Sequence, residues 1–124
     1  MLKHEDSQLK KISSIAVSVS DKDKAMKWYS EVLGMEVREN EGHWVTVGLR
    51  GDGISIHLCE DKELKPAPEG VNTGIAFSTD NVDKAYDALK SKGVEFSKLP
   101  NDEGFGMYCI FNDPDKNQFW VLGV

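Results

Sequence analysis

The stretch IAVSVSDKDKAMKWYSEVLGMEV (residues 15–37) has a second, weaker copy later in the chain, IAFSTDNVDKAYDALKSKGVEF (residues 75–96). The copies start at an offset of 60 residues, and their glycines, Gly34 and Gly93, stand at an offset of 59. Internal similarity at a fixed offset indicates a repeated supersecondary unit. The sequence therefore predicts two copies of one module, each about 60 residues long.

Within the first copy, the spacing of apolar residues changes from that of a strand to that of a helix. Apolar residues alternate with small ones over residues 14–19, which predicts a half-buried strand. Asp21 is predicted to cap a helix with one apolar stripe, formed by Ala25, Trp28, Tyr29, Val32 and Leu33. Short strands are expected near 36–40, 44–49 and 53–60, so the module has the order β-α-β-β-β.

The second copy repeats this order and completes a single domain. A strand is expected at 73–79, a helix at 82–92, and strands near 94–98, 107–112 and 118–122. The predicted organisation is a flexible arm (1–11) followed by one domain (12–124), made of module 1 (about 12–60), a polar linker (61–72) and module 2 (about 73–124). The expected fold class is α+β, with eight strands forming a curled mixed sheet around a cleft.

Strand alternation sorts the residues onto two faces of the predicted sheet. One face is apolar and is expected to lie under the helices. The opposite face mixes small residues with aromatic and hydrogen-bonding side chains, which indicates a ligand pocket. The alternative is a second layer of core, or a sheet face partly open to water. The candidate ligand-binding residues are His57, Trp44, Trp120, Tyr108, Ser14, Ser55 and Ile110.

The charge, apolar content and cysteine content of the chain argue against several classes of function. The 124 residues carry a formal net charge of −6, which argues against a nucleic acid or an anionic membrane as partner. No stretch reaches the length of about 20 apolar residues that a membrane span needs, and residues 1–11 lack the apolar segment of a signal peptide. The two cysteines, Cys59 and Cys109, have opposite strand parity and are not expected to pair, so a reducing cytoplasm is the predicted compartment.

Residues 15–37 and the segment FNDPDKNQFWVL (residues 111–122) resemble the opening strand and helix and the closing hairpin of the vicinal oxygen chelate superfamily. This superfamily includes glyoxalase I, extradiol dioxygenases, fosfomycin-resistance enzymes and bleomycin-resistance proteins. The resemblance covers residues 12–124 and implies paired βαβββ modules. It does not by itself imply one activity, because the superfamily supports many chemistries. Residues 113–116 are read as a turn and nothing more.

The enzymes of this superfamily bind one divalent metal through four strand positions. In this sequence the resemblance places Ser14, His57, Gly74 and Trp120 at those positions. Only His57 has a good metal-ligating group. The resemblance therefore implies the metal-free, ligand-binding branch typified by bleomycin-resistance proteins, with no metal site, no cofactor and no catalytic residue assigned.

Several side chains keep two interpretations. His57 is expected either to contact the ligand or to form a hydrogen-bonded pocket wall, with a role as catalytic base the less favoured reading. Trp120 either fills the vacated metal cavity or stacks on a flat ligand, and Trp44 could face it across the cleft. The loop 101–106 is interpreted as a flexible lip, with Phe105 as a candidate lid residue.

The leading functional prediction is a non-enzymatic protein that sequesters a small aromatic or heteroaromatic compound. One alternative is a metal-independent lyase or isomerase of the same superfamily, and another is a regulatory or scaffolding module without a small ligand. A homodimer is also predicted, because each module has open sheet edges that need covering. The sequence leaves open whether the modules pair within one chain or between two.

Overall fold

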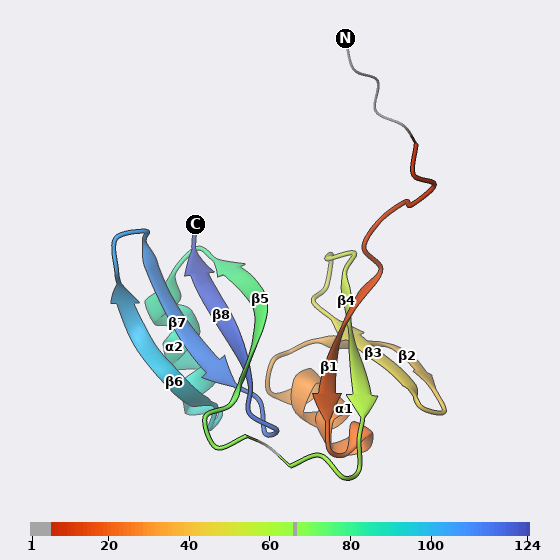
Figure 1. Ribbon diagram of the computed structural model, residues 1–124. Helices are drawn as coiled ribbons and strands as arrows, with labels where there is room; N and C mark the ends of the chain where they lie inside the picture. Colours follow the sequence, from red (N-terminus) through yellow and green to blue (C-terminus); the bar gives the residue numbers. More distant parts are fainter. Residues whose placement is uncertain (1–5, 66) are drawn as a thin grey trace.

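Both predicted modules are present in the computed structural model of the protein, which describes residues 6–65 and 67–124 (Figure 1). Module 1 consists of β1 (Ser14–Val19), α1 (Lys22–Glu31), β2 (Glu36–Glu41), β3 (Trp44–Gly48) and β4 (Ser55–Glu60). Module 2 consists of β5 (Val71–Thr79), α2 (Val82–Ser91), β6 (Glu95–Asp102), β7 (Met107–Asn112) and β8 (Asn117–Gly123). The predicted α+β class and the repeated β-α-β-β-β order are confirmed.

The eight strands divide into two four-stranded mixed sheets, with the orders β1-β4-β3-β2 and β5-β8-β7-β6. In each sheet the first and last strands of the module are parallel, while the remaining neighbours are antiparallel. The edge strands β1 and β5 lie at the sides of the sheets that face each other (Figure 1), and Ile15 and Ile75 line the same hollow there. Neither α1 nor α2 is long and apolar enough to cross a membrane, in the part of the chain that the structure describes.

The two helices start at matching side-chain caps. Asp21 accepts hydrogen bonds from the backbone N–H groups of Asp23 and Lys24, both at 3.0 Å, as the sequence predicts. Asn81 caps α2 in the same way through the N–H of Lys84, at 3.0 Å. These contacts satisfy backbone donors that the first turn of a helix leaves free. The repeated strand-to-helix junction therefore has the same physical basis in both modules.

A single hydrophobic core joins the two modules. The rings of Tyr29 on α1 and Phe119 on β8 lie with their centroids 6.2 Å apart, at an angle of 80°. Met35 and Leu49 of module 1 line the same hollow as Phe77 of module 2. The helix-covered faces of the two sheets therefore face each other across this shared core. The opposite face of each sheet, called the outer face below, points away from it.

The turn at Asp113 does more than the sequence predicted. Asp113 is 3% exposed and accepts hydrogen bonds from the hydroxyl of Tyr29 and from the backbone and side chain of Asn117. The side-chain amide of Asn117 also donates to the carbonyl of Ser18 in β1, at 2.8 Å. The reading of residues 113–116 as a turn only is thus wrong, because this turn connects module 2 to module 1.

Two strand boundaries differ from the sequence prediction for identifiable reasons. β5 begins at Val71, inside the expected linker 61–72, because the N–H of Val71 bonds to the carbonyl of Lys116 at 2.9 Å. β6 continues to Asp102 past a proline, since two register shifts let it follow β7. Residues 1–5 of the expected arm lie outside the described residues, and residues 6–11 are exposed and belong to no helix or strand.

Candidate functional site

His57 lies near the centre of the outer face of module 1. It stands on β4 between Ala16 of β1 and Thr46 of β3, which are its Cα partners. The Trp44 ring covers the imidazole, with centroids 3.9 Å apart and an angle of 32° between the planes. His57 Nε2 is buried and has no hydrogen-bond partner among the described residues. Trp44 itself is 38% exposed, so this aromatic pair presents a ring to the surroundings.

Ser14 and Ser55 are paired on the neighbouring strands β1 and β4. Ser55 Oγ accepts a hydrogen bond from Arg38 at 3.2 Å, and the same guanidinium donates to the carbonyl of Leu49 at 2.6 Å. Arg38 was not among the candidates from the sequence. The sequence feature that could have indicated it is Gly48, because an added Cβ at that position would lie 2.4 Å from Arg38 Cζ. Gly48 thus leaves room for a half-buried cation beside the two serines.

The outer face of module 2 carries a column of three aromatic rings. Trp120 on β8 stacks on Tyr108 of β7, with centroids 5.0 Å apart and planes at 16°. Phe105 stacks on Tyr108 from the β6–β7 loop, at 5.0 Å and 28°. Tyr108 is only 2% exposed, and Ile110 is the Cα partner of Trp120 on the adjacent strand. The indole N–H of Trp120 donates to Asn72 Oδ1 at 3.2 Å, which fixes the plane of the ring.

An ion pair borders this column. Lys98 Nζ lies 5.4 Å from the centroid of the Tyr108 ring and contacts the carboxylate of Glu103. The hydrogen bond between the two groups raises the pKa of Lys98 and lowers the pKa of Glu103. Both side chains are exposed, so solvent screens the pair strongly. Neither Lys98 nor Glu103 was predicted from the sequence, because the contact between them depends on the shape of the loop.

The seven predicted ligand-binding residues thus fall into two groups. One group lies on module 1 and contains Trp44, His57, Ser14 and Ser55; the other lies on module 2 and contains Trp120, Tyr108 and Ile110. Within one chain the structure does not bring the groups together, since both occupy outer faces and the shared core lies on the other side of each sheet.

The residues at the superfamily's metal positions do not fit a divalent cation. His57 supplies the one imidazole of the set, and its Nε2 is buried. Gly74 has no side chain, and its φ of +74° is unfavourable for any other residue. No group of three or more His, Cys, Asp or Glu side chains suited to a metal occurs within residues 6–65 and 67–124. Of the four positions, only His57 therefore offers a good ligand to a divalent cation.

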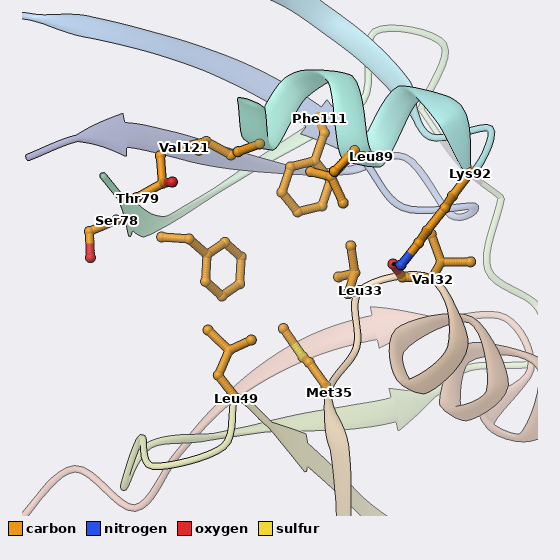
Figure 2. Close-up of a pocket in the computed structure, with 13 residues that line it drawn as sticks. Val32, Leu33, Met35, Leu49, Ser78, Thr79, Leu89, Lys92, Phe111 and Val121 are labelled. Atoms are coloured by element: carbon orange, nitrogen blue, oxygen red, sulfur yellow. Dashed lines mark hydrogen bonds between the residues drawn. The ribbon is translucent and has the colours of Figure 1, made fainter. Parts of the chain in front are cut away.

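A separate apolar cavity of about 330 Å³ lies between the modules, on the core side (Figure 2). Leu33, Met35 and Leu49 of module 1 point toward Leu89 and Phe111 of module 2 across it (Figure 2). Lys92 reaches over its rim to the carbonyl of Val32, at 3.4 Å. None of the seven predicted ligand-binding residues lines this cavity. It is the seam between two packed modules and is distinct from the outer faces.

Known proteins share this arrangement along nearly the whole chain. Residues 11–121 match the family described as the Glyoxalase/Bleomycin resistance protein/Dioxygenase superfamily. A member of that superfamily from Sphaerobacter thermophilus is 31% identical, with a TM-score of 0.82 over 94% of this chain and 99% of that one. TnmS3, an antibiotic binding protein from Streptomyces sp. CB03234, is 26% identical, with a TM-score of 0.80 over 95% of this chain and 98% of that one.

A curated relative of greater length carries an enzyme name. The lactoylglutathione lyase of Schizosaccharomyces pombe is 28% identical over 140 aligned residues, which cover 90% of this chain. The alignment covers 46% of that enzyme, so this chain corresponds to about half of its length.

Proposed function

The chain belongs to the Glyoxalase/Bleomycin resistance protein/Dioxygenase superfamily, and from this premise we propose that it binds a small planar aromatic or heteroaromatic compound without a metal ion. The observation that carries the proposal is the pair of aromatic clusters on the outer faces, Trp44 on His57 and Trp120 on Tyr108. Aromatic side chains that stack in this way offer flat surfaces to a flat ligand. The similarity to an antibiotic binding protein supports the same class of function.

The proposal includes a homodimer. Because the two aromatic clusters lie on outer faces directed away from the shared core, they flank one ligand only when two copies meet. The outer face of module 1 in one copy would then lie opposite the outer face of module 2 in the other. The edge strands β1 and β5 each have a hydrogen-bonded neighbour on one side only, which favours association of this kind.

His57 favours one second candidate, a metal-independent lyase or isomerase. Its buried Nε2 lacks a partner among the described residues, and a bound substrate could supply one. Histidine is a common general base in enzymes. The similarity to a lyase supports this candidate, although it concerns about half of that enzyme. Chemical conversion of a bound compound, abolished by His57→Gln, would distinguish an enzyme from a binding protein.

The proposed compartment is the cytoplasm. Cys59 and Cys109 are both unpaired thiols, and Cys59 is exposed. Free thiols persist in reducing compartments, which supports this assignment.

Native mass spectrometry of the full chain after mild lysis tests the proposal, together with fluorescence titration using the planar probe acridine. We expect a dimer that carries no stoichiometric metal, and quenching of tryptophan fluorescence that is reduced in Trp44→Ala and in Trp120→Ala. Trp28 on α1 lies outside both clusters, so Trp28→Phe is the control. One equivalent of bound metal in the unmodified protein would contradict the metal-free part. If acridine bound equally well to the unmodified protein, to Trp44→Ala and to Trp120→Ala, the proposed site would be wrong.

A further inference from the structure

Phe105 is an exposed aromatic residue that nevertheless covers another ring. It is 63% exposed, yet its ring stacks on Tyr108 at 5.0 Å. Its neighbours Gly104 and Gly106 have φ values of +107° and +108°, a region that other residues rarely adopt. The backbone N–H groups of both glycines donate to Asp102 Oδ1, at 2.8 and 3.2 Å. The chain on either side of Phe105 is therefore shaped to place this ring on Tyr108.

The same loop also places a carboxylate beside the Lys98 ammonium. Glu103, two residues before Phe105, contacts the Lys98 ammonium, which lies 5.4 Å from the centroid of the Tyr108 ring. Tyr108 and Lys98 come from the neighbouring strands β7 and β6. One short segment thus covers a ring with a ring and a cation with a carboxylate.

We propose that Glu103 and Phe105 act as an internal substitute for the ligand, and that the Tyr108 ring with the Lys98 ammonium forms a subsite for a planar aromatic carboxylate. The loop moves away when such a compound binds, and both contacts pass to the compound. This inference rests on the proposed function and adds to it the ligand's charge and the identity of the group that it displaces.

The contacts that hold the loop on this subsite are weak enough to be exchanged. The Lys98–Glu103 pair is exposed on both sides, and exposed ion pairs contribute little to stability. Phe105 buries only part of its surface on Tyr108. A polycyclic ring would cover Tyr108 more completely, and its carboxylate would replace that of Glu103 beside Lys98. Since both loop contacts are lost together, the free protein discriminates against ligands that offer only a ring or only a charge.

Two probes of the same shape test the subsite in the full chain. Anthracene-2-carboxylate has a ring and a charge, and anthracene-2-carboxamide has the ring alone. We expect Phe105→Ala to bind both probes about two- to tenfold more tightly than the unmodified protein, because one competing ring stack is gone. Glu103→Gln should also tighten the binding of both probes, because the ion pair that the displaced loop gives up is then absent. Lys98→Gln should remove the preference for the carboxylate over the carboxamide.

A matched control exists on α2. Lys90 Nζ lies 5.8 Å from the centroid of the Tyr86 ring, so Lys90→Gln removes a similar cation from a similar ring elsewhere. We expect this variant to bind both probes as the unmodified protein does. Ring protons of Phe105 should be shifted upfield in the NMR spectrum of the free protein, and the shift should disappear on saturation with anthracene-2-carboxylate.

Opposite results would separate this inference from the proposed function. If Phe105→Ala binds the probes equally or more weakly, Phe105 is no competitor and the inference is wrong, while tryptophan quenching by acridine would still support planar-ligand binding. If acridine binds but neither anthracene probe does, the inferred ligand class is wrong. If no planar compound quenches the tryptophans, the proposed function fails and the inference fails with it.

Discussion

The hydroxyl of Tyr29 in α1 donates a hydrogen bond of 2.5 Å to Asp113 Oδ2 in the β7–β8 turn, across 84 positions of the sequence. Asp113 also accepts bonds from the backbone N–H groups of Asp115 and Asn117, at 2.9 and 2.8 Å. A buried carboxylate with several donors is a strong anchor, because its bonds are charge-assisted and shielded from water. This contact therefore sets how the two modules are oriented.

Tyr29→Phe removes only the hydroxyl of this contact. We expect a loss of about 1.5–3 kcal/mol in the free energy of unfolding, the usual contribution of a hydrogen bond to a charged group. Urea denaturation followed by circular dichroism measures it. Tyr86→Phe on α2 is the control, since the Tyr86 ring packs on Phe96 at 4.7 Å. Equal stability of Tyr29→Phe and the unmodified protein would mean that the bond does not stabilise the fold.

Asp113 should also give stability a distinctive pH dependence. Burial raises the pKa of this carboxyl above its ordinary 3.8, although the bonds from Tyr29 and Asn117 act to lower it. The folded protein therefore keeps a proton that the unfolded chain has already released. The contribution of Asp113 to stability falls as the pH rises from about 3.8 through the folded pKa, and then stays constant.

Asp113→Asn isolates this effect from the other carboxylates. We expect the stability difference between the unmodified protein and the variant to shrink with rising pH in that window. Urea denaturation at half-unit steps from pH 3.5 to 7 provides the comparison. A difference that grows with pH would show that burial does not dominate at Asp113.

Trp120→Ala should weaken the binding of a planar ligand by about an order of magnitude, since one stacking partner contributes roughly 1 kcal/mol beyond area burial. The fold should remain intact, because Trp120 lies on the outer face and the core is on the other side of its sheet. Fluorescence titration with acridine and a thermal melt measure the two effects separately. A large loss of melting temperature would place Trp120 in the core instead.

Rebuilding the superfamily's metal positions should have a cost at Gly74. In the proposed dimer, where module 1 of one copy faces module 2 of the other, Ser14→His, Gly74→His and Trp120→Glu should together create zinc affinity near His57, whereas the unmodified protein should bind no stoichiometric zinc. The φ of +74° at Gly74 makes any side chain there unfavourable by about 1–2 kcal/mol. Gly74→Ala measures this strain alone. Calorimetric titration with zinc would contradict the prediction if the unmodified protein bound one equivalent.

The two thiols should differ sharply in reactivity. Burial raises the pKa of Cys109 to about 11, whereas Cys59 is exposed. Since the thiolate is the reactive form, iodoacetamide at pH 8 should modify Cys59 alone in the folded protein and both cysteines in urea. The mass of the intact protein reports the number of adducts. Rapid double modification without urea would mean that β7 opens readily.

The fold was predictable from the sequence because its signals are local. Alternation over β1 and the stripe on α1 each span only a few residues, and the repeat supplied the second module. The features that the sequence did not predict depend on contacts between residues far apart in the chain. Nothing local to Arg38 indicates that it binds carbonyls of the β3–β4 loop, and nothing local to Asp113 indicates a partner in α1. Strand alternation correctly placed Trp120 and Tyr108 on the same face of the sheet. It gave no information about how the two modules are oriented relative to each other.

The core shared by the modules also determines how the two halves would behave as separate molecules. Each half alone would leave uncovered the apolar surface that the other half now covers, such as Phe119 without Tyr29. Cutting the chain between β4 and β5 would therefore yield complementary fragments that fold by associating, at a rate that depends on their concentration. In the intact chain the connecting segment holds each module at a high effective concentration near the other, so folding does not depend on protein concentration. The protein is, in physical terms, a covalent pseudo-dimer.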